Sequence, residues 1–459
     1  MSSLVLINRQ NLLSNLKVIK DLCPNSILAP CLKSNAYGHG LLQIATILEN
    51  VKNPKNSSKD SSKDSSKDSS SENLEENSEI KNSQNISNNS PIWFTLSSFS
   101  EAQLLRQNGI KTPILLVNSL ESFEIEKILE MENIRISLYS WQILQLAAQI
   151  SFEKKQKLTI HLQIDTGMHW LGFETFEIVE IIEFIKKQEF LELEGIWTHF
   201  ASSEDLENSY FDKQLADFLA LKKLVIGTFG NIVKLWHCAN SGAILRDFKE
   251  KSEFNLVQPG KILYGSFVTG IMRQICETKQ IILKPVLSWQ TQIRQIKKLQ
   301  KGDSIGYSQA FICEMETEIA ILQVGYNDGI PRNVTSGFVL IDGQKCPFVG
   351  RICMNLCMVK IPKNHNFEIG QTVILIGKSV EKTEYDKTEN PEKIEAKNSQ
   401  NSKLTNQNTN LVKSKSETEN KSESEVANEI TLGLFAGWCG TIGREISVGI
   451  NSQIERKIV

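Results

Sequence analysis

The chain has 459 residues and a formal net charge of −2, from 51 Lys and Arg against 53 Asp and Glu. This balance gives no electrostatic reason to expect a nucleic acid or an anionic membrane as a partner. No apolar run approaches the ~20 residues that cross a bilayer, and at roughly 100–200 residues per domain the length corresponds to two or three domains.

The N-terminal segment MSSLVLINRQNLLSNLKVIKDL lacks the basic start and apolar stretch of a signal peptide, so we expect a cytoplasmic protein. Nine cysteines are an odd number without a disulfide pattern, which predicts reduced thiols. Cys353 and Cys357 lack CxxC spacing and have no second Cys/His pair nearby. We therefore expect core thiols here rather than a metal site.

Two segments differ from the rest in composition. Residues 52–90 contain a tandem SSKD repeat, and residues 380–428 are similarly rich in Lys, Glu, Asn and Ser. Such sequences bury too little apolar surface to offset the entropy of ordering. We expect two disordered surface insertions. A regulatory or partner-binding role for them is the alternative.

Outside the first insertion, residues 1–268 alternate between short β-rich runs and helical patterns. The expected strands are residues 27–34, 91–98, 112–119, 134–140, 158–165, 193–200, 232–239 and 254–261. Helical patterns such as residues 176–190 and 211–227 lie between them. Eight strands with intervening helices predict a (β/α)8 barrel of the TIM type, in which functional residues follow the carboxyl ends of the strands. Chemistry-bearing residues at these ends are Lys33, Asp165, His199, Asn240 and Ser241.

The pattern changes in residues 269–459. Strand-like runs at residues 286–293, 318–324, 337–343, 357–362 and 371–377 follow one another without helical patterns between them. Turn segments such as LQKGDS and DGQK separate them. This organisation predicts a second domain that is mostly β.

The segment CLKSNAYGHG, residues 31–40, places Lys33 at the end of a buried-looking strand. Lysine is rarely buried without a partner or a purpose. A desolvated lysine loses its proton more easily and can attack an aldehyde to form a Schiff base. From these residues alone, a snorkelling or salt-bridged lysine is an equal alternative.

Three further motifs suggest a phosphate site and a proton-transfer group. In HCANSGAIL, residues 237–245, Ser241 starts a helix and offers a hydroxyl beside free backbone N–H groups, although a plain helix cap is also possible. In VQPGKILYG, residues 257–265, Gly260 follows the eighth strand, where such barrels commonly bind phosphate. Tyr307 in DSIGYSQAF could donate and accept a proton, or be structural.

Together and in this order, the four motifs resemble the alanine racemase family of pyridoxal 5′-phosphate (PLP) enzymes. Further segments agree with that family: IDTGMHWLGF, GIWTHFASSED, VGYNDGIPR and GRICMNLCMV. The resemblance runs from about residue 4 to the C-terminus, apart from the two insertions. It implies a PLP-binding (β/α)8 barrel, a β domain, and a head-to-tail homodimer with shared active sites.

The resemblance also assigns roles to residues. Lys33 matches the lysine that binds PLP and serves as one catalytic base, and Tyr307 matches the second base, delivered from the other subunit. In the family the lysine serves the D-isomer and the tyrosine the L-isomer. The residues that match cofactor contacts are Tyr37, His199, Asn240, Ser241, Gln258, Gly260 and Arg444. Those that match positions near the substrate carboxylate are Tyr326, Met354 and Trp170.

Several of these positions depart from the family. Gln258 replaces an arginine that contacts the pyridine nitrogen, and a neutral amide can either donate to that nitrogen or accept from it. Trp170 replaces an arginine near the substrate carboxylate, and Gln163 replaces a frequent lysine. Asn355 stands where Asp is usual, and Arg444 stands where a phosphate-binding tyrosine is expected. Arginine could pair with phosphate equally well.

The main expectation is an isomerase that interconverts L- and D-alanine by two-base chemistry and supplies D-alanine for peptidoglycan. One alternative is a racemase of broader specificity or a related PLP decarboxylase. Another is a non-catalytic PLP-binding protein. The racemase-like context of Tyr307 argues against a decarboxylase, and the β domain argues against a PLP carrier, because carriers of this barrel type lack one.

Overall fold

The computed structural model describes residues 3–52, 91–207, 209–267, 269–334, 336–378 and 428–459. The predicted insertions at residues 52–90 and 380–428 therefore lie outside the described residues, apart from one terminal residue of each. Contacts divide the chain into two compact units. One comprises Leu6–Leu287 with Glu455–Val459, and the other comprises Met1–Val5 with Ser288–Ile454.

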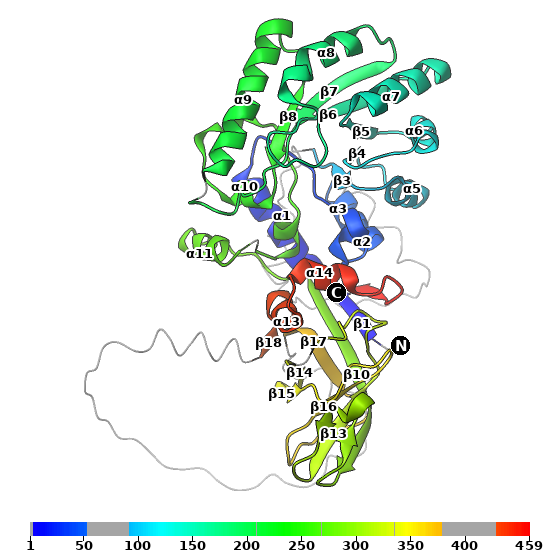
Figure 1. The fold of residues 1–459 in the computed structure, drawn as a ribbon, viewed down its shortest axis with the longest axis vertical. Helices are drawn as coiled ribbons and strands as arrows, with labels where there is room; N and C mark the ends of the chain where they lie inside the picture. Colours follow the sequence, from blue (N-terminus) through cyan, green and yellow to red (C-terminus); the bar gives the residue numbers. More distant parts are fainter. Residues whose placement is uncertain (1–2, 53–90, 208, 268, 335, 379–427) are drawn as a thin grey trace, which may run out of the picture. The chain divides into compact units, whose positions relative to one another are not determined.

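The first unit is built on eight parallel strands, in the order β2-β9-β8-β7-β6-β5-β4-β3 (Figure 1). Isolated parallel bridges join Leu28 to Ile92 and Cys31 to Thr95, so the chain after β2 also pairs with the segment of β3. The two edges of the sheet thus meet, and the predicted (β/α)8 barrel is confirmed. The strands are β2 (Ile27–Leu28), β3 (Phe94–Leu96), β4 (Ile114–Leu116), β5 (Ile134–Leu138), β6 (Leu158–Gln163), β7 (Leu191–Trp197), β8 (Leu235–Ala239) and β9 (Leu256–Val257).

Helices follow most barrel strands, with local signals that explain where they begin. The Ser98 side chain accepts a hydrogen bond from the Glu101 N–H at the start of α5. In α8, Ile178, Ile181, Ile182 and Ile185 are buried, which is the i, i+3, i+4, i+7 spacing of a core-facing stripe. The helices are α1 (Arg9–Leu22), α2 (Lys33–Tyr37), α3 (Leu41–Lys52), α5 (Phe99–Gln107), α6 (Ser122–Leu129), α7 (Trp141–Lys154), α8 (Ile178–Lys186), α9 (Tyr210–Phe229), α10 (Ser241–Leu245) and α11 (Gly270–Thr278).

The second unit is mostly antiparallel sheet, as predicted. Long strand β10 pairs with β17 in its first half and with β13 in its second, after an irregularity between Ile293 and Gln295 that turns the strand. The strands are β10 (Leu287–Leu299), β11 (Ser304–Ile305), β12 (Phe311–Ile312), β13 (Thr317–Leu322), β14 (Phe338–Ile341), β15 (Gln344–Pro347), β16 (Cys357–Lys360), β17 (Thr372–Lys378) and β18 (Glu429–Ile430). Helices α13 (Leu432–Cys439) and α14 (Gly443–Gly449) follow.

The chain ends add strands β1 (Ser3–Ile7) and β19 (Arg456–Ile458), which the sequence analysis does not anticipate. The expected domain limits, 1–268 and 269–459, remain a prediction, while contacts keep α11 and the residues up to Leu287 with the barrel. All nine cysteines are free thiols. Burial raises the pKa of the Cys346 thiol to about 12. No helix in the described part of the chain is long and apolar enough to cross a membrane.

Candidate active site

Lys33 begins α2, directly after the segment that closes the barrel. The next four residues, Ser34 to Tyr37, all have φ between +53° and +55°, a left-handed turn that non-glycine residues rarely adopt. Such strain persists only where surrounding contacts hold it. Here the Asn35 N–H donates to Glu101 Oε1 at 3.1 Å, and the Leu41 N–H donates to Asn35 Oδ1 at 2.7 Å. The backbone beside Lys33 is therefore fixed in an unusual conformation, as is common at functional sites.

The predicted phosphate contacts come together from three segments of the barrel. The Gly260 N–H donates to Ser241 Oγ at 3.0 Å. A Cβ atom on Gly260 would lie 2.6 Å from the Tyr37 hydroxyl oxygen and 3.8 Å from Ser241 Oγ, so only glycine fits there without movement. Two hydroxyl groups and a glycine backbone thus surround one small space, which we call the hydroxyl cradle (Tyr37, Ser241, Gly260).

Asn240 links the end of β8 to the loop after β7. Its Oδ1 accepts hydrogen bonds from the Ala243 N–H at 3.1 Å, as the cap of α10, and from the Ser203 hydroxyl at 2.6 Å. Its Nδ2 donates to the Phe200 carbonyl at 3.2 Å. All the polar atoms of the Asn240 amide are therefore engaged in holding the two loops, and these contacts fix the start of α10 with Ser241.

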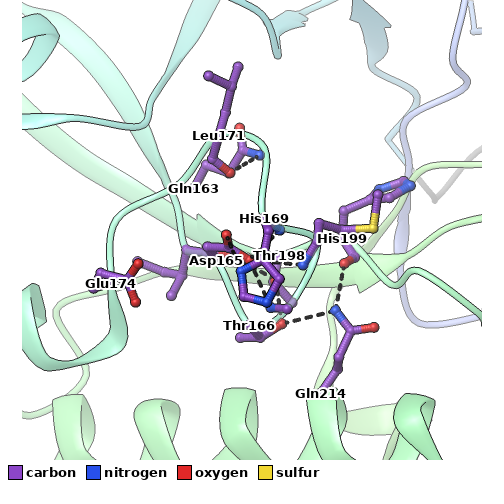
Figure 2. Close-up of polar contacts among 12 residues, drawn as sticks. Gln163, Asp165, Thr166, His169, Leu171, Glu174, Thr198, His199 and Gln214 are labelled. Carbon is purple, nitrogen blue, oxygen red and sulfur yellow. Dashed lines mark hydrogen bonds and ion pairs between the residues drawn. The ribbon is translucent and has the colours of Figure 1, made fainter.

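The loop after β6 is organised around Asp165 (Figure 2). Its Oδ1 accepts hydrogen bonds from the backbone N–H groups of Gly167, Met168 and His169 at 2.7, 2.9 and 3.2 Å. This loop presents Trp170, whose ring centre lies 5.4 Å from that of His199. Trp170 is 57% exposed, so it offers an accessible apolar surface beside the histidine.

Buried Gln214 of α9 joins the loops after β6 and β7, and Figure 2 shows it pointing to both. Its Nε2 donates to the His199 carbonyl at 3.1 Å and approaches Thr166 Oγ1 at 3.5 Å. The Ala201 N–H donates to its Oε1 at 2.9 Å. Through these bonds α9 holds the backbone of His199 in place, a contribution that the sequence analysis missed because a glutamine in a helix gives no distinctive signal.

Gln258 follows β9 and its amide is engaged at both ends. Its Nε2 donates to Thr95 Oγ1 at 3.4 Å, and its Oε1 lies 3.3 Å from Nδ1 of His237. His237 Nε2 lies in turn 2.8 Å from Nδ1 of His161. Neither histidine was among the predicted site residues. The sequence does carry a signal for them, because each interrupts an apolar strand at a core position. These strands are LTIHLQID and IVKLWHCA.

The other predicted residues belong to the β unit, where all but Arg444 stand on loops or turns. Tyr307 is 64% exposed and starts a short 3-10 turn between Gly306 (φ +73°) and Ser308 (φ +59°). The Tyr326 N–H donates to the Cys353 carbonyl at 3.0 Å, which brings the predicted pair Tyr326 and Met354 onto adjoining loops. Asn355 next to Met354 is exposed, and so is Arg444 on α14.

Comparison with known proteins identifies the relationship. The family profile "Alanine racemase, N-terminal domain" matches residues 7–53 and 87–267, and the profile "Alanine racemase, C-terminal domain" matches residues 286–400. The alanine racemase of Borreliella burgdorferi (strain ZS7) is 31% identical over 383 residues, covering 82% of this chain and 89% of the relative. That of Halalkalibacterium halodurans is 32% identical over 374 residues, covering 81% and 83%.

The chain belongs to the alanine racemase family. Solved structures agree on the fold. The alanine racemase of Clostridium difficile 630 matches with a TM-score of 0.76 at 24% identity, covering 100% of this chain and 96% of that one. The Bacillus anthracis alanine racemase with bound L-Ala-P matches with a TM-score of 0.74 at 24% identity, covering 100% and 95%.

The residues that depart from the pattern of the alanine racemase family lie in distinct local surroundings. Gln258 faces a histidine pair rather than standing alone. Gln163 donates from Nε2 to the Leu171 carbonyl at 2.8 Å, while its buried Oε1 has no partner among the described residues (Figure 2). Trp170 places an uncharged ring where the family has an arginine.

Proposed function

We propose that this chain is a PLP-dependent isomerase that interconverts L- and D-alanine and so supplies D-alanine for peptidoglycan synthesis. The observation that carries the proposal is the pairing of Lys33, at a strained strand end, with the hydroxyl cradle of the same barrel. A racemase of broader specificity is the second candidate, because the exposed ring of Trp170 stands where the family has an arginine near the substrate carboxylate.

The residues present fit PLP. The Tyr37 and Ser241 hydroxyls can donate hydrogen bonds to a phosphate, and the missing Cβ of Gly260 leaves room for one. The Lys33 amine is of the type that binds the cofactor aldehyde, and the side chain is half-buried at the start of α2. When bound, PLP withdraws electrons from an attached amino acid and so acidifies its Cα proton.

Racemisation requires that a proton leave one face of Cα and return to the other. We assign these faces to the Lys33 amine and the Tyr307 hydroxyl. Tyr307 stands on an exposed loop of the β unit, which supports its use by a neighbouring subunit. The proposed assembly is therefore a head-to-tail homodimer in which each site combines one barrel with the partner's β unit. Tyr326 and Met354 would lie near the substrate carboxylate, and Arg444 near the phosphate.

The test is incubation of the purified protein, loaded with PLP, with L-alanine in D2O. Two-base racemisation should place deuterium at Cα in both enantiomers. Absence of a lysine-linked PLP absorption band together with absence of D-alanine would refute the proposal. A panel of other amino acids, assayed for the D-isomer and for CO2, separates a broader racemase or a decarboxylase from an alanine-specific enzyme.

A further inference from the structure

A line of four hydrogen-bonding side chains crosses the interior of the barrel to Gln258. Glu194 Oε2 lies 3.2 Å from His161 Nε2, His161 Nδ1 lies 2.8 Å from His237 Nε2, and His237 Nδ1 lies 3.3 Å from Gln258 Oε1. Both imidazoles are fully buried. We call this line the barrel relay (Glu194, His161, His237, Gln258). None of the roles assigned above uses its first three members.

Irregular backbone positions make room for the barrel relay. In the pairing of β6 with β7, Ile160 faces Leu193 and His161 faces Gly195, so Glu194 is the extra residue of a bulge. A Cβ atom on Gly195 would lie 2.5 Å from His161 Nδ1, so a glycine is needed there for the imidazole to fit. Bulges commonly re-aim side chains, and this one accompanies the contact between a carboxylate and a core histidine.

Hydrogen-bond chemistry constrains where the protons of the relay are. Gln258 Oε1 can only accept, so His237 must carry its proton on Nδ1 for that contact to be a hydrogen bond. His237 Nε2 then accepts, and His161 donates from Nδ1. Because the Glu194 carboxylate also only accepts, His161 needs a second proton on Nε2. The arrangement with the amide oxygen toward His237 thus requires His161 to be an imidazolium.

With one proton fewer, the donors of the His161–His237 and His237–Gln258 contacts reverse. His161 keeps its proton on Nε2 for Glu194, so its Nδ1 accepts from His237 Nε2–H, and His237 Nδ1 becomes an acceptor. The last contact is then satisfied only if the Gln258 amide turns over and donates from Nε2. The oxygen and nitrogen of a primary amide have nearly the same size, so this turn changes hydrogen bonding with little change in packing.

We propose that Glu194, His161 and His237 are positioning residues for Gln258, and that the number of protons on the two imidazoles decides which end of its amide faces His237. The opposite end of the amide, which contacts Thr95 Oγ1, then presents a donor when the relay is protonated and an acceptor when it is neutral. The consequence for the cofactor rests on the proposed function, because in the family the residue at position 258 contacts the pyridine nitrogen. An acceptor there would retain a proton on that nitrogen and make the ring a stronger electron sink.

The charged groups that act on the two imidazoles favour the neutral relay at neutral pH. Burial and the charge of Arg135 on β5 together lower the pKa of His161 by more than Glu194 raises it. Burial and the neighbouring His161 lower the pKa of His237 well below its ordinary value. Burial raises the pKa of the Glu194 carboxyl, but hydrogen bonds from His161 and Arg135 outweigh this and bring it to about 2. Glu194 is therefore a permanent acceptor at one end of the line.

The test reads the histidine protons directly, by 15N NMR of the PLP-loaded protein labelled at its 6 histidines. At about pH 8 both imidazoles should be neutral with the proton on Nε2. As the pH falls below the ordinary pKa of imidazole, His161 should gain a second proton while the His237 proton moves to Nδ1 in the same transition. Independent titrations, no transition, or a neutral His161 beside His237 protonated on Nδ1 at about pH 8 would overturn the proposal.

Glu194→Gln removes the permanent acceptor, since an amide can also donate to His161. The His237 resonances at about pH 8 should then shift from a pure Nε2–H form toward a mixture of both forms. Glu192→Gln is the matched control: Glu192 lies two residues earlier on β7 and pairs with Lys234 at 2.7 Å, outside the relay, so this change should leave the resonances in place. An unchanged His237 in Glu194→Gln, or an equal shift in the control, contradicts the relay.

Two safeguards keep this test separate from the proposed function. If Glu194→Gln fails to fold, the titration of the unaltered protein still tests whether the two histidines change protonation together. A sample that shows no PLP band contradicts the cofactor assignment, yet its histidine spectrum still tests the relay. Conversely, a failed prediction of the histidine protons leaves the assignment of Lys33 to PLP untouched.

Discussion

The barrel unit and the β unit present their predicted site residues in opposite ways. In the barrel, Ser241 and Asn240 are held by hydrogen bonds to backbone and side chains of neighbouring loops. In the β unit, Tyr307 and Met354 are large side chains that stand more than half exposed on loops. A site needs its reacting groups held by their surroundings. The barrel residues of the predicted site are thus held within their own unit, whereas the β-unit residues stand exposed, as the proposed shared site requires.

The largest effect on activity is expected from a change at Lys33 in the barrel unit. Lys33→Ala removes both the group that would attach PLP and one proposed base, so we expect loss of the lysine-linked absorption band and a fall in kcat on the order of 10⁴-fold. Absorption spectra and racemisation rates measure both. Lys187→Ala, at an exposed lysine after α8, serves as the control and should change neither. An intact band in Lys33→Ala would show that PLP is held elsewhere.

Tyr307→Phe tests whether the β unit supplies the second catalytic base. Loss of the hydroxyl should lower kcat roughly 10²–10⁴-fold while leaving the PLP band unchanged. Because the tyrosine is assigned to the L-isomer, solvent exchange of the Cα proton should be lost for L-alanine and retained for D-alanine. Deuterium incorporation into each pure enantiomer measures this asymmetry. Equal loss for both enantiomers would contradict the assignment of faces.

Mixing Tyr307→Phe with Lys33→Ala sharpens the comparison between the two units. In a head-to-tail dimer one of the two sites of a mixed dimer is intact, so random reassembly should restore about one quarter of the unaltered activity. If Tyr307 served the barrel of its own chain, no mixed site would be intact. Mixtures that stay inactive after verified subunit exchange would therefore exclude shared sites.

A smaller effect is expected in the hydroxyl cradle. Gly260→Ala would place a Cβ atom 2.6 Å from the Tyr37 hydroxyl oxygen, which must move. We expect PLP to bind about 10-fold more weakly, corresponding to about 1.4 kcal/mol, as measured by titration of the absorption band. Gly227→Ala is the matched control, since a Cβ atom there meets nothing within 4 Å. Equal affinities in the two variants would show that the cradle does not hold the phosphate.

The sequence could predict the barrel because its eight strands are short apolar runs whose ends expose polar residues in a fixed order. It could not predict the left-handed turn after Lys33, because Ser34 and Ala36 ordinarily avoid positive φ, and Glu101, which binds the Asn35 N–H between them, is distant in sequence. Nor could it predict the contact of His161 with His237, which are 76 positions apart and meet only when the sheet curls. Contacts set by closure of the barrel leave no mark on local sequence patterns.

Trp170→Arg is expected to have the smallest effect. It tests whether the barrel unit lacks a positive charge for the substrate carboxylate. An arginine here restores the charge that the family uses near the substrate carboxylate. An exposed ion pair contributes only about 0.2–1 kcal/mol, so the KM for alanine should fall by roughly 1.4- to five-fold. Trp170→Gln provides an uncharged control at the same position. A lower KM in the arginine variant alone would show that charge limits binding, whereas an equal change in both would show that the bulk of Trp170 does.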